Sequence, residues 1–253
     1  MEAIITIWIC IIGAIMGSFL GCMGYRIPNK IKTTYPSSFC SSCKKPLKWY
    51  MNIPIISYLL QGGKCKYCGK KIGFIYFFIE VLGAILFTLN YKLYGFDMNF
   101  FVTTILTCVL IVTIVSDFEY YYISDRVLVI SAICLLIVFF IFLPRTDFYM
   151  RIVTGVVLFL FMFGIKILGN SMFETESLGD GDIKLMAVIG LSLGLVNSFI
   201  ALFFAAVLGL LFSLITMVKN KEHMIPFGPF LLIGALLVIY LSNYITPLVD
   251  KLL

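Results

Sequence analysis

Charged side chains are scarce in this chain. Lys, Arg, Asp and Glu make up 13% of its 253 residues, against 61% hydrophobic residues, and the mean hydropathy is +1.06. A soluble core of this size cannot hide so much apolar surface from water, so a soluble fold is excluded. The composition therefore predicts an all-α polytopic membrane protein.

The chain also has only one histidine and no glycine-rich cofactor loop. The single histidine, His223, lies beside Glu222 and has no partner for histidine-based catalysis. No internal repeat, low-complexity tract or Gly-rich phosphate loop is found along the chain. The net charge of +6 is explained by membrane topology, so no nucleic-acid partner is expected.

Eight apolar runs are read as plausible membrane spans against the roughly 20 residues that a helix needs to cross a bilayer, although the sixth is short. The first follows Glu2 instead of a basic segment and lacks a clear cleavage site, so we expect a permanent span rather than a signal peptide. The stretch 183–218 could form one long helix, but Gly190, Gly194 and the polar pair Asn197-Ser198 indicate a tight turn, so two spans are expected there. The expected spans cover residues 3–23, 73–91, 99–116, 127–143, 152–169, 183–195, 198–218 and 229–246.

The distribution of Lys and Arg predicts the orientation of these spans. Ten of the 19 lie in the segment 24–72. If that segment is cytosolic, alternation of eight spans places fifteen basic residues inside and four outside, which is a strong positive-inside bias. Both acidic clusters described below then lie at cytosolic ends of spans.

Three regions are expected from this pattern: a first transmembrane helix (1–23), a cytosolic cysteine-rich insert (24–72) and a multi-span block (73–253). The insert is too small for a substantial apolar core. It contains two Cys-x-x-Cys pairs separated by 21 residues, the spacing of a four-thiolate zinc site. A reducing cytosol disfavours disulfides there. The predicted metal ligands are Cys40, Cys43, Cys65 and Cys68.

Two acidic clusters beside apolar runs are the candidate catalytic elements. One begins at Asp117 and ends at Asp125, and the other is the run Gly-Asp-Gly-Asp that ends at Asp182. Carboxylates next to membrane spans are costly, and two that share a proton can activate water and polarise a peptide carbonyl. Asp117 and Asp182 are the predicted pair. Asp125 competes with Asp117 but is interpreted as a helix cap, and Asp180 is interpreted as a flanking residue.

These residues together resemble the type IV prepilin peptidases, which are GxGD-type membrane aspartyl proteases. The two acidic clusters match the two catalytic motifs of that family. Three further segments are similar to family signatures and occur in the expected order: Gly17-Ser-Phe-Leu20 followed by Tyr25-Arg-Ile-Pro28, the run Trp49 to Tyr58, and Ile225-Pro-Phe-Gly-Pro229. The resemblance covers nearly the whole chain.

The resemblance implies a bifunctional enzyme of the bacterial cytoplasmic membrane. It would cleave the basic leader of type IV prepilins or pseudopilins after a glycine, at an active site facing the cytosol. It would then methylate the new N-terminal amine with S-adenosylmethionine. Asp117 and Asp182 would be the catalytic aspartates, and the cysteine insert would be linked with methylation. Apart from the resemblance, Glu80 stands alone inside the second span. It is either a polar residue that serves the second reaction or a buried carboxyl group hydrogen-bonded between helices.

Two other functions are compatible with parts of the pattern. A membrane transporter or channel with a zinc-binding cytosolic regulatory loop would use the acidic residues to bind cations, but it would place them near mid-membrane rather than at span ends. An assembly scaffold without activity would not need glycines beside the acidic residues.

Overall fold

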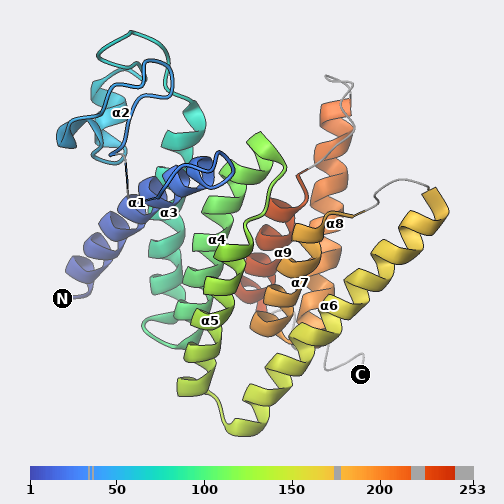
Figure 1. Cartoon of the computed structure of the whole chain (residues 1–253). Coiled ribbons are helices and arrows are strands. Elements are labelled where there is room, and N and C mark those ends of the chain that lie inside the picture. The colour runs from blue at the N-terminus through green and yellow to red at the C-terminus, as the bar shows by residue number, and fades with distance from the viewer. Residues whose placement is uncertain (34, 36, 174–177, 218–225, 243–253) are drawn as a thin grey trace.

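The computed structural model describes residues 1–33, 35, 37–173, 178–217 and 226–242, and its regular structure is helical. Among these residues β-structure is limited to two isolated bridges within the cysteine insert. Figure 1 shows a bundle of long helices with the insert at one end. The long helices are α1 (Glu2–Arg26), α3 (Phe74–Tyr94), α4 (Met98–Tyr120), α5 (Asp125–Phe142), α6 (Arg145–Phe173), α7 (Asp180–Leu193), α8 (Leu195–Met217) and α9 (Gly228–Tyr240).

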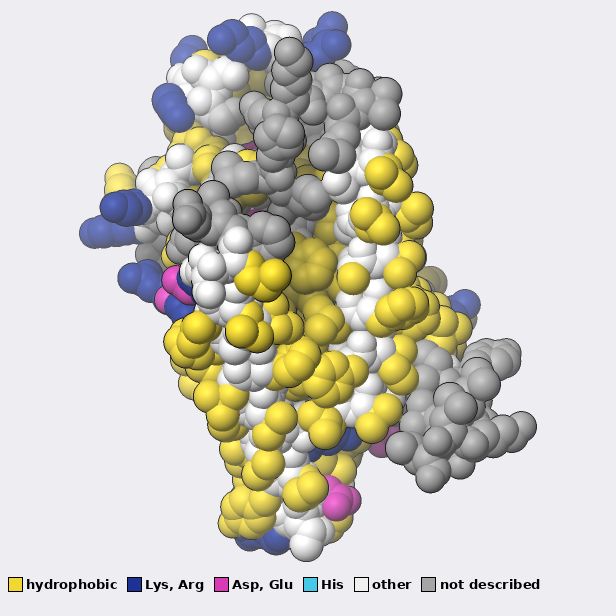
Figure 2. All heavy atoms as spheres, turned by 90° about the vertical axis from the view of Figure 1, so that its right-hand side faces the viewer, with side chains coloured by type: hydrophobic (Ala, Val, Ile, Leu, Met, Phe, Trp, Pro, Cys, Tyr) yellow, Lys and Arg dark blue, Asp and Glu magenta, His cyan; other side chains and the backbone are white. Residues whose placement is uncertain are grey.

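Each expected span coincides with one of these helices, which confirms the all-α polytopic fold. Six of them, α1, α3, α4, α5, α6 and α8, are long and apolar enough to cross a membrane. The other two, α7 and α9, have 14 and 13 described residues, so the count of eight crossings stays a prediction. Apolar side chains cover most of the face shown in Figure 2, with Lys and Arg mainly at the end that carries the insert.

Several helix boundaries differ from the expected ones. The fifth span begins at Arg145 rather than near residue 152, because Pro144 directly precedes the helix and its carbonyl accepts the Phe148 N–H. The third extends to Tyr120, so Asp117 lies in its last turn and not after its end. The expected break between the sixth and seventh spans is reduced to Gly194, whose φ of 82° suits glycine.

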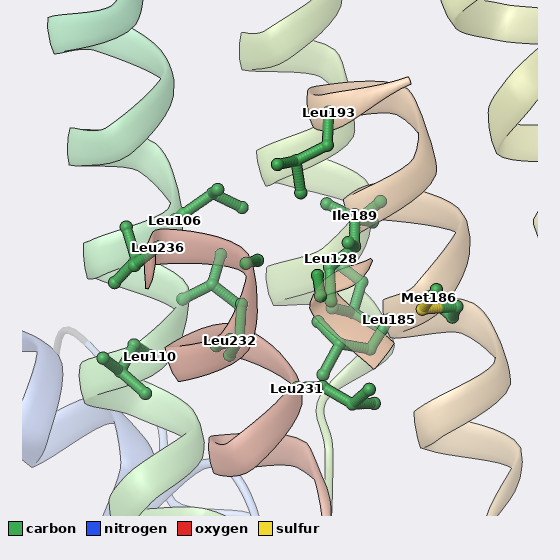
Figure 3. Close-up of a cluster of buried hydrophobic side chains, with 14 of the residues drawn as sticks. Leu106, Leu110, Leu128, Leu185, Met186, Ile189, Leu193, Leu231, Leu232 and Leu236 are labelled. Atoms are coloured by element: carbon green, nitrogen blue, oxygen red, sulfur yellow. The ribbon is translucent and has the colours of Figure 1, made fainter. Parts of the chain in front are cut away.

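Helix α4 is the centre of the bundle. Its most apolar window is 67% buried inside the protein, whereas the windows of the other five candidate spans are 22–28% buried. It packs against α1, α3, α5 and α9, and α7 contacts α5, α6 and α9. Figure 3 shows the resulting apolar contact between α4, α5, α7 and α9, with Leu106 and Leu110 opposite Leu232 and Leu236. The C-terminal end of α4 thereby lies close to the N-terminal ends of α7 and α9.

The insert contains a 3-10 turn (Trp49–Met51), the short helix α2 (Ile56–Leu60) and the four predicted cysteine ligands. It is connected to the end of α1 and the start of α3. A direct bond ties it to the membrane helices, because the Ile55 N–H donates to Glu80 Oε2 of α3 at 2.6 Å. The insert is therefore fixed to the bundle beside the first two long helices.

Candidate active site and cysteine site

Asp117 is buried in the last turn of α4, with 6% of its surface exposed. Its Oδ2 accepts a hydrogen bond of 3.1 Å from the backbone N–H of Gly228, the first residue of α9. A Cβ at Gly228 would lie 3.0 Å from the same oxygen. The glycine therefore lets the start of α9 approach the carboxyl group closely, and its N–H supplies the partner that a buried carboxyl needs.

Asp182 lies in the first turn of α7, where the unpaired N–H groups of the helix favour a negative charge. Its Oδ1 is buried and has no hydrogen-bond partner in the described part of the protein. The charge of Asp117 acts on its carboxyl group, which shows that the two side chains are close in space. An unpaired buried carboxyl oxygen beside a second carboxyl is suited to hold a water molecule.

Ile123 joins the two halves of this site. Its side chain lies 2.8 Å from where a Cβ would stand at Gly181 and 2.7 Å from where one would stand at Gly228. One apolar side chain thus fills the space between the start of α7 and the start of α9. It needs glycine at both positions, and it packs between the start of α7, which carries Asp182, and the start of α9, whose N–H binds Asp117.

The two competing aspartates lie in different surroundings. Asp125 is the first residue of α5, and its carboxylate forms a 2.7 Å ion pair with Lys184 of α7. Asp180 forms a 2.6 Å ion pair with Lys166 of α6. Their side chains are 63% and 73% exposed. Exposed and paired with lysines, these two carboxylates connect neighbouring helices.

The four predicted cysteine ligands form one cluster. Their Sγ atoms all lie within 4.8 Å of one another, and Cys40 and Cys68 are 4.0 Å apart. Four sulfurs about 2.3 Å from a tetrahedral zinc ion would be separated by about 3.8 Å. The thiols therefore fit a zinc ion with only small movements, although all eight cysteines are free in the structure.

The two halves of the cysteine cluster have the same backbone shape. In each, the N–H of the first cysteine donates to the residue five positions on, Lys45 or Lys70. In each, the residue after the second cysteine, Lys44 or Gly69, has a positive φ near 60–70°. Burial opposes ionisation of the Cys40 thiol, but backbone N–H groups of the turn and hydrogen bonds with the Cys65 and Cys43 thiols together outweigh it and lower its pKa to about 7. Turns that present N–H groups to sulfur favour thiolate, the form that binds metal.

Comparisons with known proteins agree with this architecture. Residues 11–94 match the Bacterial Peptidase A24 N-terminal domain, and residues 104–214 match the Type IV leader peptidase family. A protein of Bacillus subtilis named prepilin leader peptidase/N-methyltransferase is 32% identical over 230 residues, which cover 90% of each chain. Proteins of the same name from Neisseria gonorrhoeae and Vibrio cholerae are each 29% identical, covering 88% and 77% of this chain and 86% and 79% of theirs. No solved structure matches at a comparable level of significance.

The helical bundle and these matches define a multi-pass membrane peptidase. The chain belongs to the type IV leader peptidase family.

Sequence reasoning missed two elements of the candidate site. The Gly228 N–H was noted only as part of a family-like segment, and Ile123 only as a position within the first acidic motif. No periodicity or charge pattern could identify them, because each acts through contacts with residues far along the chain. Of the segment Ile225–Pro229, Ile225 lies outside the described residues, as does His223.

Proposed function

We propose that this enzyme cleaves the leader of type IV prepilins or pseudopilins with Asp117 and Asp182 as its catalytic pair. The observation that carries the proposal is the convergence of two carboxyl groups from the ends of separate helices, one buried and one with an unpaired buried oxygen. The charge of Asp117 acts on the carboxyl group of Asp182. Two carboxyl groups that interact in this way resist double ionisation, so the pair holds one proton at neutral pH.

The shared proton gives the two groups complementary roles. The ionised carboxylate takes a proton from water as the water oxygen attacks the scissile carbonyl carbon. The protonated carboxyl donates to the carbonyl oxygen. Proton transfer to the leaving nitrogen then breaks the C–N bond, which releases the leader with a new carboxylate and the pilin with a free amine. The N–H of Gly228 holds Asp117 in place for this step.

The orientation of the chain supports a cytosolic site in the bacterial cytoplasmic membrane. The insert that holds ten of the 19 basic residues is joined to the end of α1 and the start of α3. The end of α4 reaches the same region, since the rings of Tyr25 and Tyr120 lie 6.3 Å apart. A pilin helix held among the spans would thus present its basic leader on the cytosolic side.

We also propose that the enzyme methylates the new amine and that the cysteine cluster binds a structural zinc ion. The relatives' shared name includes N-methyltransferase. S-adenosylmethionine supplies an electrophilic methyl group: an N–C bond forms as the C–S bond breaks, the electron pair stays on sulfur and the nitrogen releases a proton. Zinc would order an insert that has no apolar core of its own.

The transporter interpretation receives no support from the geometry. Asp117 and Asp182 lie in terminal helical turns, and neither is at the middle of a candidate span. The other two aspartates of the acidic clusters, Asp125 and Asp180, are exposed and form ion pairs with lysines. A cation pathway would need carboxylates within the membrane-spanning part of the bundle.

Four isosteric substitutions test the catalytic assignment. Asp117→Asn and Asp182→Asn should each abolish cleavage of a co-expressed pilin-like substrate, while the protein remains in the membrane. Asp125→Asn and Asp180→Asn are the matched controls and should retain at least half of the wild-type cleavage, because exposed ion pairs contribute little. Mass spectrometry of the substrate shows whether its leader has been removed. Cleavage by Asp182→Asn would refute the pair, and loss of cleavage in both controls would show that the test is not specific.

The same mass spectra test methylation. A leaderless product with one added methyl group on its N-terminus would support both activities. A leaderless product without the methyl group would remove the second activity and leave the first in place.

A further inference from the structure

A cavity separate from the aspartate pair lies between the insert and the first two long helices. It has a volume of about 180 Å³ and is lined by the end of α1, the turns of the insert and the start of α3. A second cavity of about 560 Å³ shares with it Ser18, Cys22, Arg26, Ser38 and Asn52. The two cavities are therefore neighbours, and the second has the size of a small-molecule site, which is roughly 300–1,000 Å³. Leader cleavage by Asp117 and Asp182 makes no use of this space.

Glu80 supplies the acidic group of the cavity. It projects from α3, and its carboxyl group accepts the Ile55 N–H at 2.6 Å and a hydrogen bond from Ser18 of α1. Ile55 has φ 64° and ψ −55°, and the Ile56 N–H bonds to the Pro54 carbonyl at 2.6 Å. This is a γ-turn of the strained kind, which is rare for a β-branched residue. The carboxyl group of Glu80 thus holds a strained turn at the cavity wall, as is common at functional sites.

The other walls carry groups of complementary chemistry. Lys70 and Lys71 line the cavity, as do the aromatic rings of Tyr25, Phe39 and Tyr58. S-adenosylmethionine has an ammonium group, a carboxylate, a ribose with two hydroxyl groups and a flat adenine. The carboxylate of Glu80 can accept hydrogen bonds from the ribose hydroxyl groups or the ammonium group of the ligand. The lysines can pair with the ligand's carboxylate, and the aromatic rings can stack on adenine. The residues present therefore fit the methyl donor.

We propose that this cavity binds S-adenosylmethionine and that Glu80 anchors it through a hydrogen-bonded polar group. This inference rests on the methylation activity proposed above. The location also suits a reaction that follows cleavage. Tyr25, which lines the cavity, contacts Tyr120, three residues beyond Asp117 on α4. The last turn of α4 therefore connects Asp117 to a side chain that lines the cavity.

Binding to the full-length protein in detergent tests the proposal independently of turnover. Isothermal titration with S-adenosylmethionine, and with its product S-adenosylhomocysteine, should give at least tenfold weaker binding for Glu80→Gln than for wild type, or about 1.4 kcal/mol. The glutamine oxygen can still accept the Ile55 N–H, so the turn is kept. Asp147→Asn, which removes an exposed carboxylate in the first turn of α6, is the matched control and should bind as wild type.

Photo-crosslinking of the wild-type protein with an azido-adenine analogue of the donor provides a second measurement that needs no variant. Label should be found in peptides from residues 18–80, and label confined to other segments would overturn the proposal. Binding by Glu80→Gln within twofold of wild type would also overturn it, while methylated pilin from the wild type would leave the proposed function intact. If wild type neither binds the donor nor methylates pilin, the methylation activity itself fails, and this inference fails with it.

Discussion

Replacing Gly228 by alanine is the sharpest test of the geometry around Asp117. The new Cβ would lie 2.7 Å from Ile123 Cδ1 and 3.0 Å from both Asp117 Oδ2 and Thr113 Cγ2. Ordinary contacts begin at 3.4 Å, so the Ile123 side chain or the start of α9 must move by about 0.7 Å, the difference between 3.4 and 2.7 Å. Such a movement pulls the Gly228 N–H away from the carboxyl group that it holds at 3.1 Å.

The expected effect is larger on activity than on stability. Overpacking of this kind costs about 1–3 kcal/mol, which a bundle of this size can tolerate. Catalysis is more sensitive, because a misplacement of roughly 1 Å can lower a rate about a hundredfold. We therefore expect kcat/KM for leader cleavage to fall by about two orders of magnitude, measured with purified enzyme and a pilin-like substrate in detergent.

Two further variants separate this explanation from a general loss of folding. Gly164→Ala adds the same methyl group within α6, where no atom of the described residues outside its own helix lies within 4 Å, and it should cleave as wild type. Gly228→Ala combined with Ile123→Val removes the nearest clashing atom and should recover part of the activity. Wild-type activity of Gly228→Ala would refute the positioning role of this glycine, and so would a loss that the second substitution leaves unchanged.

Other contacts lead to three further predictions. Cys65→Ser should lower the zinc content from about one ion per chain, because only three thiolates remain; elemental analysis showing equal zinc would contradict a four-cysteine site. Gly17→Leu should lower the thermal unfolding temperature in detergent, since its Cβ would lie 2.6 Å from the Ile79 carbonyl oxygen and separate α1 from α3; an unchanged temperature would argue against this helix contact. Tyr240→Phe removes a 2.6 Å hydrogen bond to buried Asn90 and should cost about 0.6–1.7 kcal/mol of stability, which chemical unfolding can measure.

The helices and the candidate residues were largely accessible from local sequence patterns. Apolar runs of sufficient length predicted every long helix, because a helix satisfies its own backbone within the bilayer. The spacing of the cysteines predicted a cluster, and the structure brings the four sulfurs together. Helix ends were less predictable: α4 includes Asp117, and α6 begins at Arg145. Fraying and capping decide such boundaries, and hydropathy does not report them.

Both the sequence and the tertiary structure contribute to the choice among the acidic residues. Their glycine neighbours and positions at span ends favoured Asp117 and Asp182, and the burial of Asp117 supports that choice. The lysines that pair with Asp125 and Asp180 could not be assigned in advance. Lys184 lies 59 positions from its partner, and only the packing of α7 against α5 brings the two together.

By itself, the sequence determined that the chain is a helical membrane protein with two acidic clusters and a four-cysteine insert, because hydropathy, charge and ligand spacing act over a few neighbouring residues. The tertiary structure alone decided what surrounds those groups. Packing of α9 against α4 brings the Gly228 N–H to Asp117, across 111 positions of the chain. The docking of the insert on α1 and α3 forms the cavity at Glu80. Such contacts depend on how helices pack in space, which no local pattern encodes.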